Sequence, residues 1–155
     1  MTTPTPRVDI ASRVIHASPE ALYNAWMDPE TLARWLPPGD MTGEVRRFEP
    51  WEGGRYEMVL RYRDPAIAGK SGDGADAVGA TFVELRPGER IVQRVEFDSD
   101  DPDFAGEMTM TWTFAPVRGG TEVTITAENV PPGIREEDHQ AGMHASLENL
   151  ARFAE

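Results

Sequence analysis

The clearest hydrophobic pattern lies near the C-terminus. On a helical wheel that advances about 100° per residue, five apolar residues of the segment 134–154 form one stripe, and Glu148 and Arg152 lie opposite it. This spacing predicts a long amphipathic helix. The stripe consists of Met143, Leu147, Leu150, Ala151 and Ala154.

A second strong pattern precedes this helix and has the period of a β-strand. Between Met108 and Phe114, large apolar residues alternate with threonines, so that one face is apolar and the other polar. That apolar face matches the stripe on the predicted helix. The two patterns therefore predict a sheet cupped around a C-terminal helix.

The rest of the chain supplies further strands and two short helices. Ser18-Pro19-Glu20 and Asp28-Pro29-Glu30 each have the form of a helix start, and Pro37-Pro38 ends the second helix by Leu36. Most strands are close enough in sequence for antiparallel hairpins, which predicts an α+β fold. The expected strands are 7–16, with Val8, Ile10 and Val14 on one side, then 44–48, 55–62, 77–85, 91–97, 107–114 and 121–130.

We expect one domain, residues 7–155, preceded by a flexible Thr/Pro tail at 1–6. With 155 residues, the chain has the length of a single domain. The segment 64–76 is rich in Gly, Asp and Ala and has little apolar content to offset its ordering entropy. It is expected to be a mobile loop, open to proteolysis near Lys70.

The composition argues against several classes of binding partner and bears on the cellular location of the protein. The net charge of -12 argues against nucleic acid and anionic membranes as partners. The chain has no cysteine, which excludes disulfides and thiolate metal sites. Neither a signal peptide nor an apolar run of membrane-spanning length occurs, so a cytoplasmic location is expected.

Candidate catalytic and metal-binding groups are sparse. His139 and His144 lie about 140° apart on the predicted helix, and no HExxH or comparable ligand spacing occurs, so we expect no metal or other cofactor. No nucleophile motif is present. His139 falls within the apolar stripe near the helix start, where a cavity could open. Alternatively, His139 is a hydrogen-bonded or solvent-facing residue without a catalytic or ligand-binding role.

Several segments together resemble a known superfamily. They are Ile15 to Trp35, Glu52-Gly53-Gly54-Arg55-Tyr56, 79–91, 111–114 and 142–150. In this order they resemble the SRPBCC superfamily, also called START-like or birch-pollen-allergen-like. The nearest branch is named after the C-terminal domain of the activator of the 90-kDa heat-shock-protein ATPase. One departure is Met143, because relatives often carry Trp just after the glycine of the last helix.

The resemblance implies a helix-grip fold with an apolar cavity between the sheet and the last helix. It favours non-catalytic binding of a small apolar or aromatic molecule, such as a lipid, polyketide or flavonoid-like compound. Regulation of a chaperone ATPase through the outer surface and cyclase or hydrolase chemistry with His139 and Tyr56 are the alternatives. The same residues could instead pack as a closed core. The candidate ligand-binding residues are Trp35, Tyr56, Met58, Leu60, Phe82, Val95, Met108, Met110, Trp112, His139, Met143 and Leu147.

Overall fold

A seven-stranded antiparallel sheet forms the body of the protein in the computed structural model, which describes residues 7–38, 41–64, 66–67, 69, 72 and 74–155. Its spatial order is β1-β7-β6-β5-β4-β3-β2. The strands are β1 (Val8–Ile15), β2 (Thr42–Phe48), β3 (Arg55–Arg61), β4 (Ala75–Arg86), β5 (Arg90–Phe97), β6 (Met108–Val117) and β7 (Gly120–Glu128). The helices are α1 (Pro19–Trp26), α2 (Pro29–Trp35), the short 3-10 helix η1 (Pro102–Phe104) and α3 (Glu136–Ala154).

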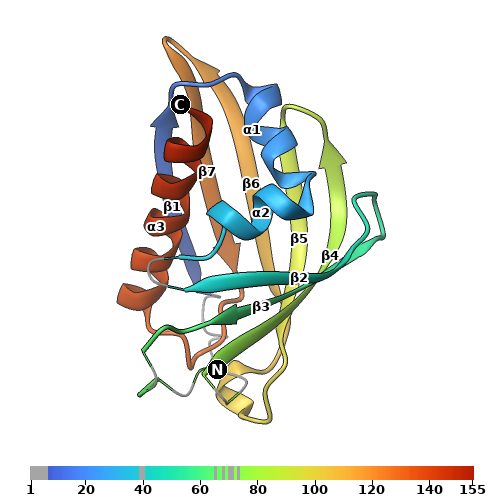
Figure 1. The fold of residues 1–155 in the computed structure, drawn as a ribbon, viewed down its shortest axis with the longest axis vertical. Helices are drawn as coiled ribbons and strands as arrows, with labels where there is room; N and C mark the ends of the chain where they lie inside the picture. Colours follow the sequence, from blue (N-terminus) through green and yellow to red (C-terminus); the bar gives the residue numbers. More distant parts are fainter. Residues whose placement is uncertain (1–6, 39–40, 65, 68, 70–71, 73) are drawn as a thin grey trace, which may run out of the picture.

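The sheet curves around α3, and α1 and α2 close one end of the space between them (Figure 1). Two irregularities in strand pairing accompany this curvature. The register shifts between Val45 and Arg47 on β2 and between Phe82 and Glu84 on β4. An extra residue at such a bulge bends a strand and increases its twist. The predicted α+β helix-grip architecture is confirmed.

Both short helices begin where the sequence predicts. The Ser18 hydroxyl accepts a hydrogen bond from the backbone N–H of Ala21 at 3.1 Å, and the Asp28 carboxylate accepts one from Glu30 at 2.9 Å. A proline follows each cap at the first helical position, where its missing N–H costs nothing. These caps fix two consecutive helices at the end of the sheet.

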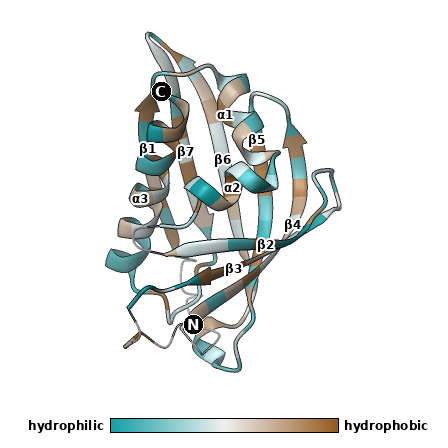
Figure 2. Cartoon of the chain, in the orientation of Figure 1, coloured by the Kyte–Doolittle hydropathy of each residue, from teal (hydrophilic) through white to brown (hydrophobic). Residues whose placement is uncertain are grey.

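The core lies between the concave face of the sheet and the helices. Apolar and polar residues alternate along the strands, as Figure 2 shows by colour. Trp26, Trp35 and Trp112 form a buried cluster at the α1–α2 end, with ring centroids 5.1 to 5.6 Å apart and edge-on geometry. The Trp35 indole N–H donates to the Ala25 carbonyl at 3.1 Å, so its polar atom is satisfied inside the core.

Strand β1 turns three of its apolar residues outward. Val8, Ile10 and Val14 are exposed, whereas Asp9, Ala11 and Ile15 face the interior. The small Ala11 leaves room for the nearby α3, and Asp9 finds polar partners there. The inward face of this strand is thus chosen by close packing and pairing rather than by hydrophobicity alone.

The segment predicted to be a loop ends earlier than expected. Strand β4 begins at Ala75, and Asp76, within that strand, is only 3% exposed. The N-terminal tail 1–6 and Lys70 lie outside the described residues, so their predicted mobility stays a prediction. Within the described part of the chain, no helix is long and apolar enough to cross a membrane.

Candidate functional site

An inner cavity of about 170 Å³ lies between the concave face of the sheet and α3. Strands β3 to β7 supply one wall, and Gly142, Met143 and Ser146 supply the helical wall. The lining is largely apolar. An apolar cavity of about 150 Å³ can remain dry and take up a molecule the size of benzene. The remaining lining residues are Trp26, Leu36, Pro38, Tyr56, Leu60, Val78, Gln93, Val95, Phe97, Met108, Met110, Trp112, Ile125 and His139.

A wider outer cavity of about 610 Å³ adjoins the inner one. Its walls include Ile134 and Arg135 just before α3, Asp138 in the first turn of α3, Tyr62 after β3, and Asp76 at the start of β4. The two cavities share five lining residues and therefore form adjacent parts of one site. The shared residues are Pro38, Leu60, Phe97, His139 and Gly142.

Helix α3 is held over this site by hydrogen bonds to the segment after α2. The Ser146 hydroxyl donates to the Leu36 carbonyl at 2.8 Å, and the Asn149 side-chain amide donates to the Pro37 carbonyl at 3.0 Å. Leu36 directly precedes the helix-stopping prolines and Pro37 is the first of them, so both acceptors lie at the C-terminal end of α2. These bonds fix the helical wall of the inner cavity against the segment that carries Leu36 and Pro38.

A buried ionic network fixes the first turns of α3 to β1. Asp9 is 2% exposed, and its carboxylate accepts two hydrogen bonds from the Arg7 guanidinium, at 2.8 and 3.1 Å. Nδ1 of His139 lies 2.8 Å from Oδ2 of Asp9. Arg7 also donates to the Ile134 carbonyl. Two segments that are distant in sequence, 7–9 and 134–139, are therefore joined here, and Asp9 sets the position of His139 at the junction of the two cavities.

The pKa of the Asp9 carboxyl lies below its usual value despite burial. Burial alone would raise this pKa, but the hydrogen bonds from Arg7 and His139 and their charges outweigh it. The pKa of Arg7 is correspondingly raised, chiefly by its hydrogen bond to Asp9. The network thus holds an ionised carboxylate in the interior next to the site.

Two tyrosines bring hydroxyl groups to the site, and each is already hydrogen-bonded. The Tyr56 hydroxyl donates to Oε1 of Gln93 at 3.1 Å, and the Tyr62 hydroxyl donates to Oδ2 of Asp76 at 2.8 Å. Burial raises the pKa of both phenols, and the bond to Asp76 raises that of Tyr62 further. Both phenols therefore stay protonated at neutral pH and serve as donors.

The structure brings eight of the twelve candidate residues together around the inner cavity, and the other four lie in the core. The eight are Tyr56, Leu60, Val95, Met108, Met110, Trp112, His139 and Met143. Trp35, Met58, Phe82 and Leu147 are at most 2% exposed and line neither cavity. They pack behind the lining and support it.

Several site residues escaped the sequence-based selection, and for Gln93 the pattern contained a signal. Gln93 lies two residues from Ile91 and two from Val95, so strand alternation places it on their inward face. Asp9 carried the opposite signal, because its apolar neighbours Val8 and Ile10 suggested that it faced outward.

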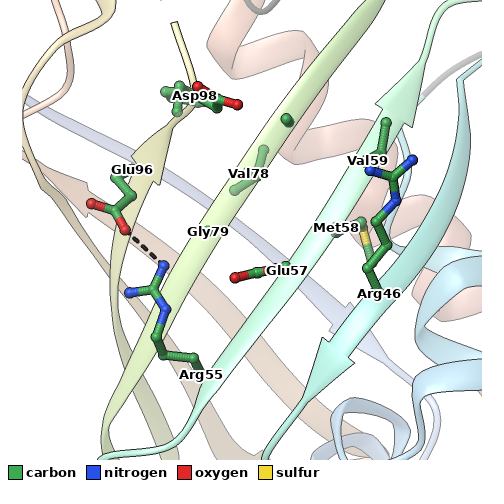
Figure 3. Close-up of a pocket in the computed structure, with 11 residues that line it drawn as sticks. Arg46, Arg55, Glu57, Met58, Val59, Val78, Gly79, Glu96 and Asp98 are labelled. Atoms are coloured by element: carbon green, nitrogen blue, oxygen red, sulfur yellow. Dashed lines mark hydrogen bonds and ion pairs between the residues drawn. The ribbon is translucent and has the colours of Figure 1, made fainter.

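A separate recess of about 450 Å³ lies on the convex face of the sheet (Figure 3). Arg55 on β3 reaches across β4 to Glu96 on β5, with Nη2 to Oε1 at 2.7 Å. This contact passes over Gly79, where an added Cβ would lie 2.6 Å from the Arg55 guanidinium. The recess is thus polar, and the charge of Arg55 is paired with that of Glu96. The site on the concave face of the sheet, by contrast, is largely apolar.

Metal binding finds no support in the described part of the chain. There, no three His, Cys, Asp or Glu side chains gather where they could hold a metal ion. His139 has Asp9 as its neighbour, but the Asp9 carboxylate is also bonded to Arg7. A cation at this position would face a guanidinium.

Solved structures share this architecture over nearly their whole length. A crystal structure of a protein from Chromobacterium violaceum has 34% sequence identity and a TM-score of 0.83, covering 96% of this chain and 98% of that one. The solution structure of the AHSA1-like protein from Aeromonas hydrophila has 23% identity and a TM-score of 0.71, with coverage of 95% and 91%. A crystal structure of a Rhodobacter sphaeroides protein has 22% identity and a TM-score of 0.71, with coverage of 93% and 89%.

The family comparison covers most of the chain. No curated protein matches the sequence. The model of the family described as Activator of Hsp90 ATPase homolog 1-like protein matches residues 16–155, from the end of β1 through α3. Together with the helix-grip fold, this match confirms the resemblance to the SRPBCC superfamily: the chain belongs to the Activator of Hsp90 ATPase homolog 1-like family.

Proposed function

We propose that this protein binds a small, largely apolar molecule in the cavity between the sheet and α3, without chemical turnover. The observation that carries the proposal is the pair of adjoining cavities that share His139 and Gly142. Ligand sites are typically concave and apolar, with a few fixed polar groups. This site has that composition, and its size suits one or two aromatic rings.

Binding is favoured over catalysis by the state of the two proton-transfer candidates. The Tyr56 hydroxyl is bonded to Gln93, and burial raises its pKa, which makes it a poor acid or base near neutral pH. His139 is oriented by Asp9, but Arg7 shares that carboxylate. Each group therefore has a structural partner that accounts for its position.

Binding is also favoured over a role confined to the outer surface. The convex recess has both Arg55 and Glu96 in its lining, and these charges pair with each other. A partner that used them would have to replace this contact. The apolar interior, by contrast, offers contact area that no described residue fills.

N-phenyl-1-naphthylamine, a neutral probe that fluoresces in apolar surroundings, tests the proposal. We expect saturable binding at one site per chain and thermal stabilisation that grows with probe concentration. The variant Gly142→Leu places a side chain at the junction of the cavities and should weaken binding at least tenfold. Ala141→Leu adds the same group at an exposed position of the same helix and serves as the control. Equal binding by both variants would refute the proposal.

A further inference from the structure

Gln93 is the most deeply buried amide side chain at the inner cavity. It lies on β5 opposite Met110 of β6 and Phe82 of β4, and it is 1% exposed. Met110 lines the same cavity. A glutamine at such a position destabilises the fold unless its polar atoms are hydrogen-bonded, because a buried amide without a partner keeps its full desolvation penalty.

Only one end of this amide is used within the described structure. The Tyr56 hydroxyl occupies Oε1, at 3.1 Å, whereas Nε2 is buried and has no hydrogen-bond partner among the described residues. The indole Nε1 of Trp26, a residue that lines the same cavity and is 1% exposed, is equally without a partner there. Two residues that line the inner cavity thus each carry a buried N–H donor with no partner among the described residues.

The charges around the site restrict which ligand groups can accept hydrogen bonds from these two donors. Among the described residues that line the inner cavity, none is Lys or Arg, and His139 is paired with Asp9. The described lining of the outer cavity carries Asp76 and Asp138 beside one arginine, Arg135. A carboxylate at the inner end would be a buried anion without a countercharge, which is strongly unfavourable. A neutral acceptor avoids this penalty.

We propose that Gln93 and Trp26 donate hydrogen bonds to the carbonyl oxygen of a neutral, apolar ligand, such as an aryl ketone. This rests on the proposed function, since it names the ligand class of the same cavity. The apolar part of the ligand then lies along Met108, Met110 and Met143 toward the outer cavity. The carbonyl meets two donors that no other described group uses.

Two small probes of nearly the same shape test this specificity. Acetophenone carries a carbonyl where α-methylstyrene carries a methylene group. We expect acetophenone to bind the wild-type protein about tenfold more tightly, the effect of one hydrogen bond to a buried donor. Benzoate at pH 7 should bind more weakly than acetophenone. The chain has only two glutamines, so the Gln93 amide signals are readily followed by NMR, and they should shift more with acetophenone than those of Gln140.

Two variants assign the preference to these donors. Gln93→Met keeps the length of the side chain but removes the amide, and Trp26→Phe removes the indole N–H without touching the Tyr56–Gln93 bond. Each should reduce the tenfold ratio, Gln93→Met to about two. A ratio unchanged in both variants would overturn the proposal, and either variant suffices if the other fails to fold.

The outcomes separate this inference from the proposed function. If both probes bind the wild-type protein equally well, the cavity binds apolar molecules but the carbonyl assignment is wrong. The same holds if benzoate binds more tightly than acetophenone. If neither probe binds, the carbonyl assignment fails, and the titration with N-phenyl-1-naphthylamine decides the proposed function separately.

Discussion

The carboxylate of Asp9 and the imidazole of His139 lie 2.8 Å apart and join the edge strand β1 to the first turns of α3. They are separated by 130 positions in the sequence. Arg7 completes the contact through its own bonds to Asp9. Because His139 also lines both cavities, this pair couples the stability of the fold to the shape of the site.

The substitution Asp9→Asn should destabilise the protein by about 1.5–3 kcal/mol at pH 7, the range for hydrogen bonds to charged groups. Asn keeps the size of the side chain but leaves Arg7 without a countercharge. Urea unfolding measures the change. Asp100→Asn, at an exposed position, is the control and should change the free energy of unfolding by less than about 0.5 kcal/mol. Equal effects of the two substitutions would contradict the role of the network.

The contribution of Asp9 to the free energy of unfolding should decrease on acidification. Its pKa is lower in the folded protein than in the unfolded chain, so the ionised carboxylate stabilises the fold at all pH values above its unfolded pKa of about 3.9. That stabilisation is lost as pH falls through the lower folded pKa. The stability difference between wild type and Asp9→Asn should therefore shrink below about pH 4. A difference that grows on acidification would reverse the assigned sign.

Gly142→Ala should stabilise the protein by about 0.5–1 kcal/mol, because glycine inside a helix costs this much relative to alanine. Among the described residues, an added Cβ would meet the Pro38 side chain alone, at 4.0 Å, which is an ordinary contact. Thermal and urea unfolding measure the gain. The contrasting control is Gly79→Ala, where the Cβ would collide with the Arg55 guanidinium and stability should not rise. Destabilisation by Gly142→Ala would show that the helical wall packs more tightly than described.

Met143→Trp tests whether the inner cavity has room. Met143 is 4% exposed and lines this cavity, so the larger ring can extend into it. Filling a void commonly stabilises by about 0.5–2 kcal/mol, whereas overpacking a full core costs about 1–3 kcal/mol. We expect stabilisation in urea unfolding together with weaker binding of N-phenyl-1-naphthylamine. Destabilisation without any probe binding to either protein would indicate a closed core.

The fold could be predicted because its strongest signals are local. Strand alternation from Met108 to Phe114, the helix caps at Ser18 and Asp28, and the stripe on α3 each depend on neighbouring residues alone. These signals agree with one another, which is typical of a sequence that specifies one fold.

The site was less predictable because it depends on contacts between distant segments. Periodicity indicates which residues face inward, but not whether a neighbouring side chain fills the space beside them. Phe82 and Met110 both lie opposite Gln93 in the same cross-strand row, yet only Met110 lines the cavity. The burial of Asp9 depends on Arg7 and His139, which lie on both sides of the interface between β1 and α3. No local pattern carries that information.

The most direct test of the central claim follows the methionine methyl groups by NMR during titration with N-phenyl-1-naphthylamine. Met108, Met110 and Met143 line the inner cavity, and Met27, at the end of α1, lines neither cavity and is the internal control. We predict saturable shifts of the three cavity methyl groups, with one shared dissociation constant, and little change at Met27. Saturable binding that leaves these three signals unmoved would contradict a ligand site between the sheet and α3.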